Sequence, residues 1–421
     1  MTAKHIRITA KEACCGCNAC HEICPKGCIE MRPDSLGLLY PHVDTATCNR
    51  CGLCVSTCPF SSPVSSFPPQ ECYAAINQNE SERISSSSGG VFVELARQIL
   101  NHGGVVFGAV FAKDWSVAHT YAETMEEVLP MMGSKYVQSD TRGTFGQAKH
   151  FLEEGREVLY TGTPCQIAGL KHFLHKNYPG LLTVEVICHG APAPGVWQSY
   201  LGELLTLAHG TTGKNIFSQP LNATAEISGI SFRNKKSGWQ RYYFSLQTSD
   251  SSRVGQDSHS LSLNTKDTFY EPFTKNRYMS AFLRDWSLRP SCYACKTKGD
   301  ASQADITIGD FWGAGCPTSI GNDDKGVSCV ICHTEKGCRS ISDSSLAVVP
   351  VSYNDILCGN PSLETSASLT YSAKHFQKLL SRRGFSETMH RIEFPSLPLK
   401  ANTFLFRVYS YLKRRIRPLL I

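Results

Sequence analysis

The chain has 421 residues, a net charge of +6, 41% hydrophobic residues and 20 cysteines. This size and composition predict two or three globular domains with apolar cores, and no run of about 18 apolar residues is present to span a membrane. The sequence has neither a basic stripe along its body nor a nucleic-acid reader motif, which argues against nucleic-acid binding.

The N-terminal stretch MTAKHIRITAKEACCG lacks the apolar segment of a secretory signal. We therefore expect a cytoplasmic protein. In a reducing compartment its cysteines serve as thiolates on metal or as buried apolar side chains, and not as disulfides.

Two copies of the pattern C-x2-C-x2-C-x3-C-P lie within residues 14–58. Three cysteines at this spacing wrap one 4Fe-4S cluster, and the fourth, followed by proline, ligates the other cluster. Zinc sites lack the third step and the trailing Cys-Pro. The pattern predicts one cluster on Cys14, Cys17, Cys20 and Cys58, and a second on Cys48, Cys51, Cys54 and Cys24. Cys15 is an alternative to Cys14 as a ligand, and no role is predicted for Cys28.

The predicted organisation begins with a bacterial-type two-cluster ferredoxin module over residues 1–60. Residues 61–88 are rich in Ser, Pro and Gly and are interpreted as a linker. Alternating helix and strand patterns then predict an α+β domain with an α/β core over residues 89–358. The predicted elements are an amphipathic helix ending at Gly103, a buried strand at 105–111, a helix near 141–154, a strand at 157–162, a helix at 167–176 and a strand at 181–190.

Further along, residues 228–272 alternate like a β-hairpin with its turn at 235–238. Strand patterns return at 304–313 and 326–337. Cys329 and Cys332 in the second of these are expected to point to opposite faces and to fill the core.

Residues 359–421 are predicted to form a helical C-terminal extension. It ends in a basic tail with no acidic residue after Glu393 and with six cations: Lys400, Arg407, Lys413, Arg414, Arg415 and Arg417. This tail is interpreted either as a peripheral contact with an anionic membrane or acidic partner, or as a helix packed on the body with a solvated basic face; we favour the second.

Four cysteines of the body are predicted to lie in loops beside strands: Cys165, Cys188, Cys292 and Cys295. A CxxC pair is half of a metal site, and two isolated cysteines at strand ends could complete a third 4Fe-4S cluster or a structural zinc site. The alternative is that they are buried apolar side chains. Cys165 could also be a nucleophile, but the sequence places no base beside it. His189 is interpreted as a loop hydrogen-bonding group in preference to a proton donor.

A Ser-Gly run, Ser87-Ser88-Gly89-Gly90, precedes the first predicted helix of the body. Small residues at a helix N-terminus can cradle an anion, although such runs are more often a linker and a helix cap. No GxGxxG follows a first strand, so the usual dinucleotide-binding fingerprint is missing.

Six motifs occur in a fixed order along the chain: SSGGVFVELA, GSKYVQS, TGTPCQIAGLKHFL, VICHGAPAPGVW, SCYACK and DITIGDFWG. In this order they resemble the coenzyme F420 hydrogenase/dehydrogenase family of beta subunits, in its form fused to an N-terminal 4Fe-4S dicluster module. The resemblance covers roughly residues 10–355 and implies a flavin-binding mixed α/β domain.

The resemblance also implies cofactors and site residues. Members of the family bind FAD and iron–sulfur clusters, so Cys165, Cys188, Cys292 and Cys295 look like ligands of a third 4Fe-4S cluster. The flavin-binding segments would be Ser87–Gly90 and Gly133–Tyr136, the latter containing Ser134 and Lys135, together with Thr161 and Gly162. Lys135 would place positive charge beside the reduced flavin. No residue is assigned a catalytic role.

These observations predict an iron–sulfur flavoprotein oxidoreductase. Electrons would pass between a ferredoxin-like partner protein, the clusters and FAD, and reach an unidentified small-molecule substrate or a deazaflavin-like carrier. One alternative is an electron-transfer subunit with no substrate of its own that docks to a catalytic partner, in a setting such as surface-polysaccharide synthesis. Another is a non-redox protein of polysaccharide synthesis that keeps its clusters as structure.

Overall fold

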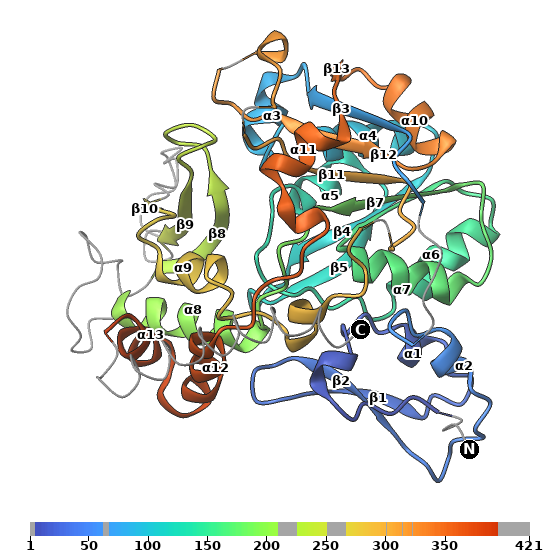
Figure 1. The fold of residues 1–421 in the computed structure, drawn as a ribbon, viewed down its shortest axis with the longest axis vertical. Helices are drawn as coiled ribbons and strands as arrows, with labels where there is room; N and C mark the ends of the chain where they lie inside the picture. Colours follow the sequence, from blue (N-terminus) through green and yellow to red (C-terminus); the bar gives the residue numbers. More distant parts are fainter. Residues whose placement is uncertain are drawn as a thin grey trace, which may run out of the picture.

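The computed structural model describes residues 5–61, 67–208, 225–250, 267–299, 301–313, 315–321 and 323–394 (Figure 1). They form an N-terminal module, a large mixed sheet covered by helices, and a three-stranded sheet with its own helices. None of the helices in these ranges is long and apolar enough to cross a membrane. The basic tail after residue 394 lies outside the described residues, so both interpretations of it stay predictions.

The N-terminal module is a short antiparallel ribbon flanked by single helical turns. Its elements are η1 (Lys11–Ala13), α1 (Ala19–Glu22), β1 (Ile29–Pro33), β2 (Leu39–Val43) and α2 (Leu53–Ser56). The strands pair from Ile29 opposite Val43 to Pro33 opposite Leu39. The cysteines lie in the loops and helical turns on either side of this ribbon.

The large sheet has eight strands in the order β13-β3-β12-β11-β7-β6-β4-β5. They are β3 (Glu71–Ile76), β4 (Val105–Phe111), β5 (Val117–Ala122), β6 (Val158–Gly162), β7 (Leu181–Val186), β11 (Ile306–Asp310), β12 (Ser328–Cys332) and β13 (Ala347–Pro350). The neighbours β11, β7, β6 and β4 run parallel and the other pairs are antiparallel. Parallel strands are covered on both faces, which explains why their sequences are nearly continuous apolar runs. The strands predicted at 105–111, 157–162 and 181–190 are confirmed, as is a mixed α/β body.

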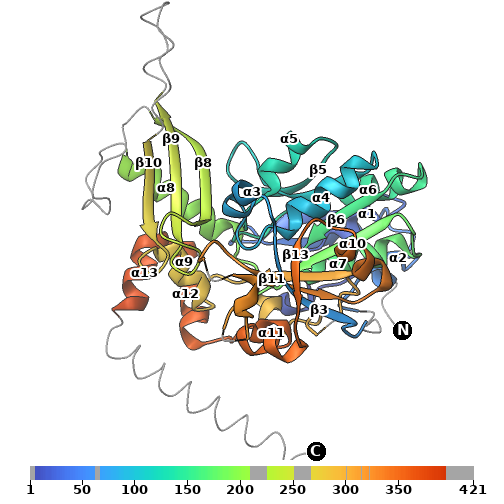
Figure 2. The ribbon, with the colours of Figure 1, turned by 90° about the horizontal axis from the view of Figure 1, so that it is seen from above.

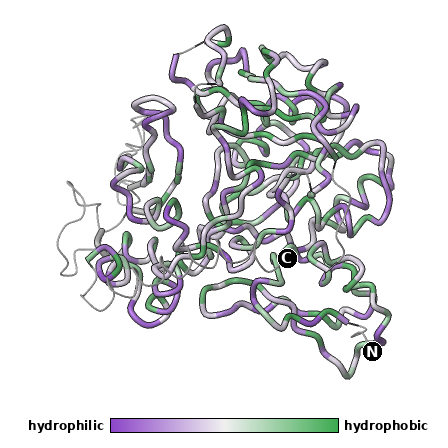
Figure 3. Tube along the Cα trace, viewed as in Figure 1, coloured by the Kyte–Doolittle hydropathy of each residue, from purple (hydrophilic) through white to green (hydrophobic). Residues whose placement is uncertain are grey.

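Helices cover both faces of this sheet (Figures 1 and 2). One face packs against α6 (Thr144–Glu153) and α7 (Pro164–Leu174), and the other against α4 (Val91–Asn101), α5 (Met125–Val128) and α10 (Glu335–Ser342). Cys329 and Cys332 belong to cores on opposite faces, as expected. Hydrophobic residues concentrate along the central strands and hydrophilic ones along the periphery (Figure 3).

The three-stranded sheet stands at one end of the molecule (Figure 2). Its strands are β8 (Ala225–Asn234), β9 (Tyr243–Asp250) and β10 (Asp267–Pro272), in antiparallel order β10-β9-β8, which confirms the predicted hairpin. It shares an aromatic core with α8 (Pro194–Ala208), α9 (Arg277–Leu283), α12 (Tyr371–Arg383) and α13 (Phe385–Glu393). The remaining elements are α11 (Tyr353–Gly359), η2 (Leu129–Met131), η4 (Pro290–Ala294), η5 (Thr318–Ile320) and η6 (Pro361–Leu363).

The linker predicted at 61–88 is wrong for residues 71–76 and 80–85, which form regular elements. It contains β3, which pairs with both β12 and β13 inside the large sheet, and α3 (Glu80–Ser85), whose Arg83 is buried. Ser and Pro residues lie directly beside these elements, and their abundance led to the linker prediction. The six-residue strand β3 pairs with strands more than two hundred residues later, so no neighbouring sequence indicated it.

The module rests on α6 and α7 through a close contact at Gly169. A Cβ atom at Gly169 would lie 2.9 Å from both Cβ and Sγ of Cys17, so only glycine allows this approach without a shift. Residues four apart share one face of a helix. Cys165, four residues earlier on α7, therefore faces the module as well.

Candidate functional site

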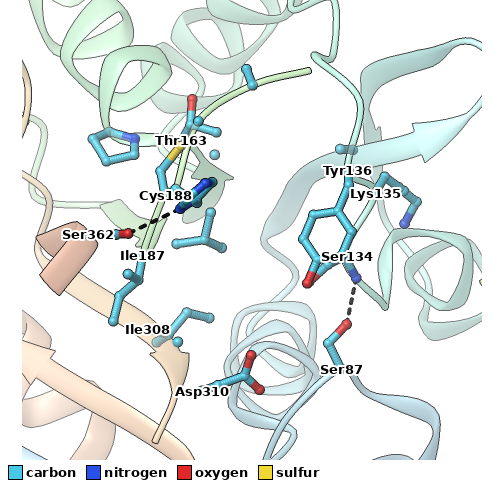
Figure 4. A pocket seen from close by; sticks show the side chains of 18 of the residues that line it. Ser87, Ser134, Lys135, Tyr136, Thr163, Ile187, Cys188, Ile308, Asp310 and Ser362 are labelled. Carbon is cyan, nitrogen blue, oxygen red and sulfur yellow. Dashed lines mark hydrogen bonds between the residues drawn. The ribbon is translucent and has the colours of Figure 1, made fainter. Parts of the chain in front are cut away.

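A cavity of about 660 Å³ brings the predicted cluster and flavin residues together. It lies where the carboxyl ends of β6 and β7 meet the loops before α4 and α7. Figure 4 shows Cys188 and Thr163 on one side and Ser87, Ser134 and Tyr136 on the other, with Asp310 between them. The volume is within the range of about 300–1,000 Å³ typical of cofactor and ligand pockets.

The four body cysteines all line this cavity. Cys188 follows β7, and Cys292 and Cys295 lie in and directly after η4. Cys165 was predicted to lie in a loop, but it lies in a helix. The helix predicted at 167–176 begins at Pro164, because Thr163 and Gln166 form a capping box, and Cys165 therefore lies in the first turn of α7.

The thiols of this set influence one another electrostatically. Burial raises the pKa of Cys188 well above its usual range, with further contributions from Cys292, Cys165 and Cys295. Burial also raises the pKa of Cys292 to about 12. Such thiols stay protonated unless a strong positive charge lies beside them, and a bound metal centre supplies that charge because it deprotonates coordinating thiols.

The donors are spread around the cavity wall. Among the described residues, no three Cys, His, Asp or Glu side chains lie close enough to hold a single metal ion. A 4Fe-4S cluster takes one thiolate at each of four corners, so a spread set of four cysteines fits a cluster better than the single zinc ion considered from the sequence.

Several N-terminal cysteines lie near cysteines of the other run, and Cys20 also lies near Cys54 of the second set. The two predicted ligand sets stay predictions. Cys20 interacts electrostatically with Cys14 and Cys58, and Cys54 interacts with Cys24 and Cys48. These contacts bring the fourth cysteine of each run to the other run, as the interleaved assignment requires. Cys28, which had no predicted role, lies among the second set, with its Sγ 3.4 Å from that of Cys24.

Cys15 lies between the module and the cavity. It is buried, lines the cavity and has side-chain interactions with both Cys17 and Cys165. The sequence offered Cys15 only as a substitute for Cys14. Its contact with Cys165, from α7, could not be foreseen from spacing.

The opposite wall contains the two predicted flavin-binding segments. They are tied together by a hydrogen bond of 2.7 Å from the Ser134 amide to Ser87 Oγ (Figure 4). Tyr136 stacks on Phe282 with ring centroids 4.7 Å apart. Gly90, with φ of +89°, leads into α4, whose N-terminus has no side-chain cap and whose first two residues line the cavity.

Three of the predicted cofactor residues have other contacts. Gly89 does not line the cavity; a Cβ there would lie 2.3 Å from the Ala75 carbonyl oxygen, so it is packed against β3. Ser88 donates its hydroxyl to the Val327 carbonyl. Lys135 donates to the carbonyls of residues 131, 132 and 133 and so braces its own loop. The prediction that its charge lies beside a flavin stays untested.

Thr161 and Gly162 line the cavity together with His119, which the sequence did not indicate. His119 donates from Nε2 to the Thr161 carbonyl at 3.0 Å and stacks on Tyr160. Its Nδ1 is buried with no hydrogen-bond partner. The sequence around His119 only indicates a strand, so it could not show that this side chain lines the cavity.

A buried ion pair closes another part of the cavity. Arg233 from β8 donates to both oxygens of Asp310, at 2.8 and 3.1 Å, and lies over the ring of Tyr242 at 4.1 Å. Trp312 completes this wall, stacked on Trp239 at 4.4 Å. Asp310 and Trp312 belong to the motif DITIGDFWG. This motif could not indicate that the partner of Asp310 is Arg233, because Arg233 comes from the other sheet.

His189 holds the loop that follows Cys188. Its Nε2 lies 2.6 Å from Asp285 Oδ1 and its Nδ1 lies 3.4 Å from Ser362 Oγ. Lys298 donates to the Cys188 and Ser362 carbonyls. These contacts agree with the loop-bonding role expected for His189.

Comparison with known proteins follows the same division of the chain. Residues 13–62 match the 4Fe-4S dicluster domain, and residues 155–348 match the family described as the C terminus of the coenzyme F420 hydrogenase/dehydrogenase beta subunit. The chain is 22% identical over 178 residues to a subunit of the F(420)H(2) dehydrogenase of Methanosarcina mazei, which covers 39% of the chain and 50% of that protein. It is 26% identical over 191 residues to the coenzyme F420-dependent sulfite reductase of Methanocaldococcus jannaschii, which covers 44% of the chain and 29% of that enzyme.

Two further similarities concern parts of the chain. An uncharacterized ferredoxin of Methanocaldococcus jannaschii is 36% identical over 52 residues, which covers 12% of the chain and 66% of that ferredoxin. A chain of the F420-reducing [NiFe] hydrogenase complex from Methanosarcina barkeri aligns with a TM-score of 0.42 and 16% identity, over 77% of this chain and 90% of that one. The chain thus spans half or less of the two longer relatives. Residues 155–348 therefore carry the C-terminal domain of the coenzyme F420 hydrogenase/dehydrogenase beta subunit, and residues 13–62 carry a 4Fe-4S dicluster domain.

Proposed function

We propose that the protein is an iron–sulfur flavoprotein oxidoreductase. A ferredoxin-like partner exchanges electrons with the N-terminal module, the four cavity cysteines hold a third 4Fe-4S cluster, and the cavity holds FAD and a two-electron substrate. When bound, the clusters supply one-electron transfers and the flavin converts them into a two-electron transfer.

The observation that carries this proposal is the order of the three thiol sets. Cys51 of the second N-terminal set is exposed, where a partner protein can approach it, whereas Cys14 and Cys17 of the first set are buried. Cys15 then connects Cys17 with Cys165 at the cavity wall. The chain therefore offers a sequence of donor sets from its surface to the cavity.

The chain's own residues shape the cavity for a flavin and a substrate. Ser87 and Ser134 hold the two predicted flavin segments together, and the uncapped N-terminus of α4 offers amide groups that suit a phosphate. The aromatic wall formed by Tyr136, Tyr242 and Trp312 suits a planar ring. We propose FAD as the occupant on this basis together with the family match of residues 155–348.

A second candidate is an electron-transfer subunit that passes electrons to a catalytic partner and has no substrate of its own. The Methanosarcina mazei relative is named as one subunit of a dehydrogenase, which favours this candidate. A 660 Å³ cavity beside the cysteines favours the first candidate, because a subunit that only relays electrons has no need of a pocket next to its last centre.

The test is anaerobic purification followed by quantitation of iron, acid-labile sulfide and flavin. We expect about twelve irons and one FAD per chain, from three four-iron clusters. About eight irons and no flavin would contradict both the third cluster and the flavin.

A matched pair of variants assigns the third cluster. We expect Cys165→Ser to lose about four irons per chain, because it removes one of four thiolate ligands. Cys332→Ala is the control, since Cys332 is fully buried in the core and does not line the cavity. Equal iron in the Cys165 variant and wild type would show that Cys165 is not a ligand.

A further inference from the structure

Arg289 is a buried cation at the junction of the module and the body. Its side chain is among the largest that are fully buried, with 1% of the residue exposed. From the start of η4 in the body it reaches into the module, where it donates to the carbonyls of Cys14 at 2.7 Å and Leu39 at 2.8 Å and lies over the Tyr40 ring at 4.5 Å. It also donates to Gln138 Oε1.

Arg289 has no carboxylate partner among the described residues, in contrast to the other buried arginines. Arg83 is paired with Asp323 at 2.8 Å and Arg233 with Asp310 at 2.8 Å. Carbonyl oxygens satisfy the hydrogen bonds of a guanidinium but carry no full negative charge. A buried charge without a counter-charge is strongly destabilising, so some group beside Arg289 has to become negative for this arrangement to be stable.

The groups beside Arg289 that can carry a negative charge are mainly thiols. Its electrostatic partners are Cys14, Tyr40, Cys15 and Cys292. One of its nitrogens, Nη2, lies 3.5 Å from Cys14 Sγ. Cys14 belongs to the N-terminal set and Cys292 to the cavity set. Arg289 therefore lies between two predicted clusters, and four thiolates give a 4Fe-4S site a net negative charge.

We propose that Arg289 is a redox-tuning residue shared by the Cys14 and Cys292 cluster sites, whose thiolates are its counter-ions. The proposal rests on the proposed function, because it requires clusters at these cysteines. A fixed positive charge stabilises the more negative, reduced state of a nearby cluster, and hydrogen bonds to ligand sulfur act in the same direction. Arg289 thereby raises the reduction potential at the junction and favours the arrival of electrons there.

The backbone beside Cys14 is built to admit this guanidinium. Gly16 has φ of +72°, and a Cβ there would lie 2.5 Å from Arg289 Nη1. Arg289 thus occupies space that a side chain would fill at any residue other than glycine. If Arg289 had a purely structural role, it would hold the module on the body equally well with or without clusters. If it is a redox-tuning residue, its effect depends on the clusters, so experiments can separate the two roles.

The first test measures potentials in the full-length protein by an EPR-monitored dithionite titration. We expect Arg289→Gln, with its iron content intact, to lower the midpoint potentials of the Cys14 cluster and of the Cys292 cluster. The reduction of each should become at least about tenfold less favourable, a downward shift of about 59 mV for one electron. Arg289→Lys keeps the charge and should stay within about threefold of wild type. Arg83→Gln is the control, because it alters another buried arginine that has no thiol partner.

The second test compares thermal unfolding of the iron-loaded and chelator-treated proteins. If thiolates are the counter-ions, Arg289→Met lowers the unfolding temperature of the loaded protein but not that of the iron-free protein, in which Arg289 is an unpaired buried charge. A structural role predicts the same loss in both. The methionine variant keeps the packing volume, and its iron-free form provides a readout even where cluster loading is reduced.

The outcomes separate this inference from the function on which it rests. Full iron with an unchanged midpoint potential in Arg289→Gln, or equal destabilisation of loaded and iron-free Arg289→Met, would overturn the inference alone. A lysine variant with the same potential drop as the glutamine variant would also contradict it, because charge would then be irrelevant. Wild-type protein without iron at the N-terminal cysteines would overturn both.

Discussion

At the scale of single residues, His119 shows how burial creates a pH dependence. Burial lowers the pKa of His119 to about 4, against 6.5 for an ordinary histidine. As pH falls below 6.5, the histidine of the unfolded chain takes up a proton before His119 of the folded protein does. The stability that depends on neutral His119 is therefore fully present above pH 6.5 and is lost as pH falls toward 4. The loss is about 1.4 kcal/mol per pH unit within this window.

We predict that His119→Phe reduces this dependence, because it keeps the ring stacked on Tyr160 but cannot be protonated. Urea unfolding of wild type and variant at pH 6.5 and 5.5 measures the effect as a difference in slope. Equal slopes for wild type and His119→Phe would show that another group accounts for the pH dependence.

At the scale of elements, α7 joins the module to the cavity. Cys165 and Gly169 share its module-facing side, and Gly169 lies against Cys17. We predict that Gly169→Ala destabilises the protein by about 1–3 kcal/mol, because the added methyl forces the module away from the helix.

The matched control for this prediction is Gly202→Ala in α8, where an added Cβ meets nothing within 4 Å. Alanine there should be neutral or stabilise by up to about 1 kcal/mol, because it favours the helix. Chemical unfolding of both variants provides the comparison. A neutral Gly169→Ala would mean that the module shifts without cost.

The elements also show what the sequence could predict. The strands β4, β6 and β7 were predictable because each is an apolar run bounded by glycine or a turn. The strand β3 was not predictable, because its six residues form a strand by pairing with β12 and β13, which lie far away in the chain.

The candidate site divides in the same way. The motifs indicated most of the residues that line the cavity, because each lies at a strand end or a helix start. Arg289, His119 and the pair of Arg233 with Asp310 were missed, since their positions depend on contacts between distant segments. The carbonyl contacts of Lys135 were missed for a different reason: a sequence shows a charge but not the direction of its side chain.

At the scale of the whole molecule, the body begins before residue 89, its predicted start after the linker, because β3 (Glu71–Ile76) is part of the large sheet. We predict that a chain beginning at residue 67 folds, because it keeps β3 between β12 and β13. A chain beginning at residue 89 should fail to fold, since it leaves two strand edges unpaired inside the large sheet.

Circular dichroism and size-exclusion chromatography of the two truncated chains distinguish these outcomes. The longer one should show cooperative unfolding, whereas the shorter one should aggregate. A shorter chain that is folded and monomeric would show that β13 can pair with β12 directly and that β3 is dispensable.

The position of β3 also affects how the protein is made. The cysteine runs and β3 leave the ribosome early, but β3 pairs only with strands that begin at Ser328 and Ala347, and Arg289 reaches Cys14 from near the end of the same interval. Pairing over such sequence distances is slow. The Cys14 side of the first cluster site therefore stays open until Arg289 has been synthesised, which leaves an interval in which iron can reach these thiols before the body is complete.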